Sequence, residues 1–115
     1  MPVMTLHGVV EQGKQQLVCA TYRVLDANML MCRSPFTGDL AFSKQLTAQQ
    51  HFRAIYHHWL LVQDAATGQL MAIDPFTRTV AWTIPMGEGA TRVDVADDNS
   101  FLLLSSATGL AKWSV

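Results

Sequence analysis

The chain has 115 residues, half of them hydrophobic and 15% charged, and its formal net charge at pH 7 is -1. This composition fits one globular domain with its own core and excludes a disordered chain. The eight basic and nine acidic residues are scattered in ones and twos, so the sequence offers no basic cluster for nucleic acid.

The first twenty residues include Glu11 and Lys14 and form no signal-peptide core. The apolar runs are all far shorter than a membrane span, so we expect no membrane binding and a cytoplasmic location. Cys19 and Cys32 lie inside apolar segments. We therefore expect two buried, reduced thiols instead of a disulfide.

Taken in chain order, runs of apolar and β-branched residues alternate with turn residues, which predicts one strand after another. Within one run, Val80, Trp82 and Ile84 alternate with small or polar residues, the period of a strand with one buried face. The expected strands lie near residues 4–10, 16–25, 29–33, 39–44, 59–64, 69–73, 79–84, 91–95, 101–105 and 110–114.

The segment between Leu46 and Trp59 fits two structures. Thr47 and Gln50 match a capping box, and apolar residues recur at helical spacing, which indicates a helix near residues 47–58. Read as a strand, the same segment places its aromatic residues on one face. The repeat described next requires a strand here, so we favour the strand and keep the helix as the alternative.

A repeat organises the sequence. LMCRSPFTGDLAFS, starting at Leu30, lies over LMAIDPFTRTVAWT, starting at Leu70, at an offset of 40 residues. A shift of 31 residues brings Trp113 under Trp82, so FLLLSSATGLAKW is interpreted as a looser third copy. A period of about 40 residues with a strand-turn-strand pattern is typical of propeller blades.

The turns of the repeat carry a common signal. Thr-Gly pairs at residues 37–38, 67–68 and 108–109 place glycine where a hairpin turn often needs a positive φ. Arg78 replaces the glycine in the remaining copy. This predicts either another turn type or backbone strain at Arg78.

The residues also resemble known propeller repeats. The segment 83–109 resembles the YVTN-type repeat through the turn at residues 87–89, the strand Val93-Asp94-Val95 and the turn at residues 97–99 before FLLL. LMAIDPFTRTVAW resembles the quinoprotein-type repeat. LAKWSV resembles the end of a WD-repeat blade, with Ser114 in place of the usual Asp.

This resemblance implies an all-β fold of propeller-like antiparallel blades in a single domain, residues 1–115, with repeat-like units near 1–42, 43–82 and 83–115. Propellers close with four to eight blades, and this chain encodes about three. The ring is therefore expected to be incomplete within one chain. A compact β-sandwich is the alternative architecture.

No pattern in the sequence supplies a catalytic acid, base or nucleophile, so we predict no enzyme, no cofactor and no metal site. The adjacent histidines His57 and His58 lack the further ligands that a zinc site needs. Four residues are the candidate contacts with a ligand or partner: Trp59, His57, His58 and Arg78.

The predicted function is a non-enzymatic protein–protein interaction module, a subunit or adaptor of a larger assembly. It would bind a protein partner or copies of itself through open sheet edges. The alternative is a lectin-like oligomer with aromatic pockets between repeats, which requires exposed tryptophans there. We instead expect Trp82 and Trp113 to lie in the core between blades.

Overall fold

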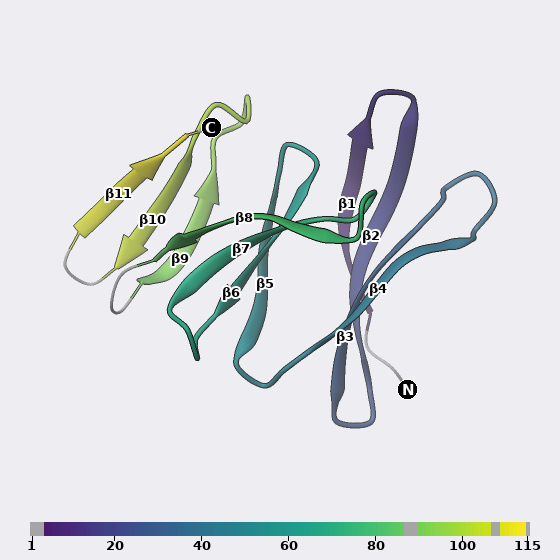
Figure 1. Ribbon diagram of the computed structural model, residues 1–115, viewed down its shortest axis with the longest axis horizontal. Helices are drawn as coiled ribbons and strands as arrows, with labels where there is room; N and C mark the ends of the chain where they lie inside the picture. The colour runs from purple at the N-terminus through teal and green to yellow at the C-terminus, as the bar shows by residue number, and fades with distance from the viewer. Residues whose placement is uncertain (1–3, 87–89, 107–108, 115) are drawn as a thin grey trace.

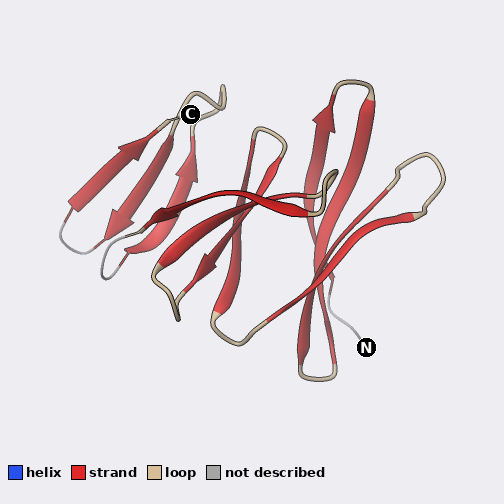
Figure 2. Ribbon diagram, in the orientation of Figure 1, coloured by secondary structure: helices blue, strands red, loops and turns tan. Residues whose placement is uncertain are grey.

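The computed structural model describes residues 4–86, 90–106 and 109–114, and this part of the chain is all-β (Figure 2). Within it, none of the residues form a helix that could cross a membrane. The strands are β1 (Met4–Gln12), β2 (Gln15–Val24), β3 (Ala27–Arg33), β4 (Leu40–Leu46), β5 (Gln50–Tyr56), β6 (Trp59–Asp64), β7 (Gln69–Asp74), β8 (Thr79–Pro85), β9 (Ala90–Val95), β10 (Leu102–Ser106) and β11 (Gly109–Trp113).

The strands form three antiparallel sheets, each built from neighbours in sequence. We call β1–β4 the N-terminal sheet, β5–β8 the middle sheet and β9–β11 the C-terminal sheet. Figure 1 shows them side by side along the long axis, with the middle sheet between the other two. The sheets do not close into a ring, which confirms the expected incomplete array of propeller-like blades.

The central strands of the middle sheet, β6 and β7, are buried on both faces. In β6, Leu60 and Val62 belong to a core cluster shared with the N-terminal sheet, whereas Leu61 belongs to a second cluster shared with the C-terminal sheet. Successive strand residues point to opposite faces, so a strand with two buried faces needs consecutive apolar residues. This requirement explains the run Trp59-Leu60-Leu61-Val62.

The register of the sheets confirms the offset of 40 residues. Cys32 pairs with Phe42 across β3 and β4, and Ala72 pairs with Trp82 across β7 and β8. A β-bulge follows directly after each of these pairs. The two hairpins are therefore equivalent in register as well as in sequence.

The shift of 31 residues is wrong. Trp113 lies in β11, the third strand of its sheet, whereas Trp82 lies in β8, the fourth strand of the middle sheet. The two rings nevertheless pack together, with centroids 4.4 Å apart. Trp82 and Trp113 recur in the sequence because both strands pack against the same core cluster. The sequence alone does not distinguish such shared packing from a true repeat.

The segment between Leu46 and Trp59 contains the strand β5, so the helix near 47–58 does not form. Thr47 and Gln50 make only one half of a capping box, because the Thr47 hydroxyl oxygen accepts from the Gln49 amide at 3.3 Å and not from that of Gln50. The Thr47 amide donates to Gln50 Oε1 at 3.1 Å, and the Gln50 amide donates to the Thr47 carbonyl at 3.1 Å. These bonds close a turn before β5, which shows that the capping signal was local and the predicted helix was not.

The expectation of reduced thiols is also wrong, because Cys19 and Cys32 form a disulfide. The two residues are direct partners across β2 and β3, their Cα atoms are 4.1 Å apart, and both are fully buried. Cross-strand partners point to the same face of a sheet, which brings the two sulfurs together. The expected turn at residues 87–89 and the residue Thr108 lie outside the described part of the chain.

Candidate functional site

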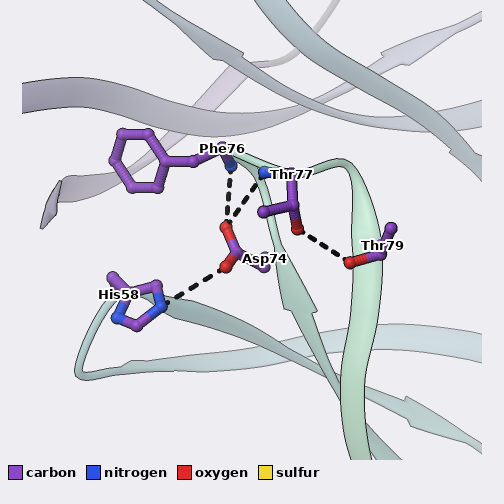
Figure 3. Close-up of polar contacts among 5 residues, drawn as sticks. All are labelled: His58, Asp74, Phe76, Thr77 and Thr79. Carbon is purple, nitrogen blue, oxygen red and sulfur yellow. Dashed lines mark hydrogen bonds and ion pairs between the residues drawn. The ribbon is translucent and has the colours of Figure 1, made fainter.

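The histidine pair forms the turn between β5 and β6. His57 is exposed and has a φ of 55°, and its amide donates to Asn99 Oδ1 at 3.4 Å. His58 is partly buried and its Nε2 lies 3.4 Å from Asp74 Oδ2 (Figure 3). The turn is therefore anchored to the C-terminal sheet through His57 and to the end of β7 through His58.

Asp74 organises the turn between β7 and β8. Its carboxylate is buried, and Oδ1 accepts hydrogen bonds from the amides of Phe76 at 2.9 Å and Thr77 at 3.3 Å (Figure 3). The Thr77 hydroxyl pairs with the Thr79 hydroxyl at 2.7 Å. The His58–Asp74 pair thus holds a turn together, and the neighbouring hydroxyls bond to each other instead of to the imidazole.

Two outcomes were predicted for the turn at Arg78, another turn type or backbone strain, and the structure shows backbone strain. The φ of Arg78 is 63°, close to the 77° of Gly38 and the 70° of Gly68 at the equivalent place in their turns. Its side-chain Nε donates to the carbonyl of Ala41 at 3.0 Å. Ala41 is the extra residue at the β4 bulge, so Arg78 satisfies a carbonyl there and links the middle sheet to the N-terminal sheet.

Trp59 is partly buried among other rings between the middle and C-terminal sheets. Its ring centroid lies 5.4 Å from that of Trp82 and 6.1 Å from that of Tyr56. Trp82 and Trp113 pack against the same buried cluster. This placement agrees with the core role expected for Trp82 and Trp113 and gives no support to open aromatic pockets between repeats.

The four predicted contact residues do not form one surface site. His57, His58 and Trp59 are neighbours on one hairpin, and Asp74 connects His58 to the turn that contains Arg78. The guanidinium of Arg78, however, is directed to the N-terminal sheet. Among the described residues, no group of three His, Cys, Asp or Glu side chains could hold a metal ion.

An exposed apolar surface that the sequence analysis did not single out lies on the face of the N-terminal sheet that points away from the middle sheet. Leu6 is 67% exposed, Met4 59% and Val9 52%. Strand pairing extends these three residues into apolar rows across β2 and β3. The rows are Met4-Tyr22-Met29 and Leu6-Ala20-Met31, and a third row, Val9-Val18, ends at Arg33 in β3.

Burial identifies this surface as a separate face. Cys19 and Val10 point into the core between the N-terminal and middle sheets, so their strand neighbours Ala20 and Val9 point the other way. Ala20 is only 3% exposed and yet belongs to neither core cluster. We call this surface the outer face. Both β1 and β2 carry apolar residues at odd and at even positions, and this pattern is the sequence signal that could have revealed the outer face.

The corresponding face of the C-terminal sheet is mixed, because Leu103 and the exposed Leu110 lie on it beside charged residues. Arg92 Nε lies 2.9 Å from Asp94 Oδ2, and Lys112 Nζ lies over the Phe101 ring at 4.6 Å. In the same sheet, β11 is an edge strand, which pairs with β10 on one side and with no other strand of the described residues on the other side. The two ends of the array therefore differ in chemistry.

Comparison with known proteins places the fold and no more. No protein-family model matches the chain, and no curated protein matches it. Among solved structures, it is similar to the crystal structure of BamB from Moraxella catarrhalis, with a TM-score of 0.55 and 17% identity. The match covers 97% of this chain and 34% of BamB, so the chain spans about a third of the length of that β-propeller protein. The specific repeat type stays a prediction.

Proposed function

We propose that this chain is a non-enzymatic protein-interaction module whose partner protein covers the outer face of the N-terminal sheet. The observation that carries the proposal is the adjacency of Met4, Leu6 and Val9, each more than half exposed. Contiguous exposed apolar patches on a folded protein mark interaction surfaces. Full burial of one aliphatic side chain contributes about 1.5–3 kcal/mol, so covering several of them supports specific binding.

The outer face favours a flat apolar partner, such as the face of another β-sheet. The opposite side of the same sheet packs on the middle sheet in this way. A second copy docked head to tail would bring Arg92, Asp94 and Lys112 of its C-terminal sheet against the apolar rows. Burying such charges without new partners is unfavourable, which argues for a different protein as the partner.

Open sheet edges offer a second mode of the same function. An edge strand such as β11 can accept an extended segment through its free backbone groups, either from a partner or from another copy of this chain. The outer face is preferred because its exposed apolar side chains are neighbours in adjacent rows, whereas charged residues surround the exposed Leu110 at the other end of the array.

The absence of enzymatic activity is part of the proposal, supported by the internal use of the His58–Asp74 pair and of the nearby hydroxyls. A cytoplasmic location also stays a proposal. Reduced thiols no longer support that location, because Cys19 and Cys32 form a disulfide and disulfides persist mainly in oxidising compartments.

Site-specific photocrosslinking tests the docking surface. Leu6 is replaced by p-benzoyl-phenylalanine in cells that produce the protein, and Leu110 is replaced in the same way as the control. Both leucines are exposed strand residues, at 67% and 72%, on opposite ends of the array. We expect one discrete adduct with another protein from position 6 and none from position 110. An adduct from position 110 alone would move the docking site to β11, and an adduct of two copies would indicate self-association.

A further inference from the structure

A second candidate site lies between the N-terminal and middle sheets, and Tyr22 is the residue that it shares with the outer face. It is a cleft of about 560 Å³, within the range of small-molecule sites. Residues from β1, β2, β3 and β5 line it together with Leu46 of β4. Sequence reasoning missed this cleft because these strands are brought together only by the packing of one sheet on the other.

A stacked pair of rings forms part of the cleft wall. His7 of β1 and Phe52 of β5 lie with their centroids 3.8 Å apart and their planes at 26°. His7 Nε2 is 2.8 Å from the Thr21 hydroxyl, which fixes the orientation of the imidazole. Burial lowers the pKa of His7, so its ring is neutral at pH 7. The pair gives the cleft a rigid, flat and partly apolar surface.

The charge around this surface is positive. Arg23 and Arg53 both line the cleft, together with His51, and no Asp or Glu is among its described lining residues. Arg53 donates through Nε to the neutral Gln63 side chain at 2.7 Å. Arg23 has only a contact of 4.0 Å with Asp26, and both of these side chains are well exposed. Neither guanidinium is therefore neutralised by a buried carboxylate.

We infer that this cleft binds an organic anion, a carboxylate carried on a flat apolar body. The guanidinium groups of Arg23 and Arg53 would hold the carboxylate, since the planar fork of Arg matches carboxylate geometry. The body would lie against the His7–Phe52 pair. Phosphate shares the charge but has no apolar part for the rings to contact. This inference is independent of the partner proposed for the outer face.

The test is a titration of the ¹⁵N-labelled chain with benzoate, acetate and inorganic phosphate, followed by nuclear magnetic resonance. Benzoate is expected to shift the amide signals of His7, Phe52 and Arg53 in a saturable manner and to bind more tightly than either other anion. Arg53→Gln should weaken benzoate binding about tenfold, as the loss of a charge-assisted hydrogen bond does. Arg92→Gln, on the C-terminal sheet, is the matched control and should leave binding unchanged.

Three results would overturn the inference. Shifts scattered over Lys112 and Arg92 would show non-specific charge binding. Equal affinity of the Arg53→Gln variant would remove the role of the guanidinium. Tighter binding of phosphate than of benzoate would exclude the carboxylate on a flat body as the ligand class.

Discussion

At the scale of single residues, the side chain of Arg78 compensates in part for an unfavourable backbone conformation. Two equivalent turns use glycine at this place, and Arg78 adopts the same left-handed conformation with a φ of 63°. A non-glycine residue in this region costs about 1–2 kcal/mol. The bond from Arg78 Nε to the Ala41 carbonyl offsets part of that cost and joins two sheets.

Two substitutions separate these contributions. Arg78→Ala loses the bond and keeps the strained conformation, so it should lower the free energy of unfolding by about 1 kcal/mol. Arg78→Gly loses the same bond but removes the strain, so it should stay close to the wild type. Urea denaturation measures both variants. Equal stability of the alanine and glycine variants would mean that the conformation carries no cost.

At the scale of elements, the hairpin β2–β3 is covalently linked, because the Cys19–Cys32 disulfide connects its two strands inside the core. The prediction of reduced thiols failed for a definable reason. Spacing along the chain does not show which strand residues face each other, and the pairing of Cys19 with Cys32 follows from a register fixed by the whole sheet.

Thiol titration checks the disulfide directly. The unfolded, non-reduced protein should show no reactive thiol, and the reduced protein should show two. The double variant Cys19→Ala/Cys32→Ala should lose about 2–4 kcal/mol of unfolding free energy, the usual contribution of a disulfide. Two reactive thiols before reduction would restore the original expectation.

Trp82 tests the equivalence of β4 and β8. Trp82→Ala should cost about 3 kcal/mol, as large-to-small core substitutions do. Trp82→Phe should cost less than about 1.5 kcal/mol, since Phe42 occupies the equivalent register position in β4. Denaturation midpoints compare the two variants. An unchanged midpoint for Trp82→Ala would instead favour an aromatic pocket open to a ligand.

Most strands, the all-β class and the 40-residue offset could be predicted because period-two alternation and turn residues are local signals. The candidate sites could not. The outer face is assembled from β1, β2 and β3, and the cleft also includes β5 and Leu46 of β4. Their members come together only through strand pairing and sheet packing. The histidine hairpin was found because its residues are adjacent in sequence, and the structure uses His58 largely for its own turn.

At the scale of the whole molecule, the array has two unlike ends. The outer face of the N-terminal sheet is apolar, whereas the far side of the C-terminal sheet presents Arg92, Asp94 and Lys112. The middle sheet packs against a neighbouring sheet on each side, and its central strands β6 and β7 are buried on both faces. This asymmetry favours a directional role, in which one end docks on a partner and the other end stays solvated.

The most direct test of that role combines the photoreactive residue at position 6 with a charge placed beside it. Val9→Glu adds a carboxylate to the outer face, where Val9 is 52% exposed, and Leu110→Glu adds one to the C-terminal sheet as the control. Both variants should keep the denaturation midpoint of the parent, because neither position lies in a core cluster. We predict that Val9→Glu abolishes the adduct formed from position 6, whereas Leu110→Glu leaves it unchanged. An adduct that persists at full yield in Val9→Glu would contradict docking on the outer face.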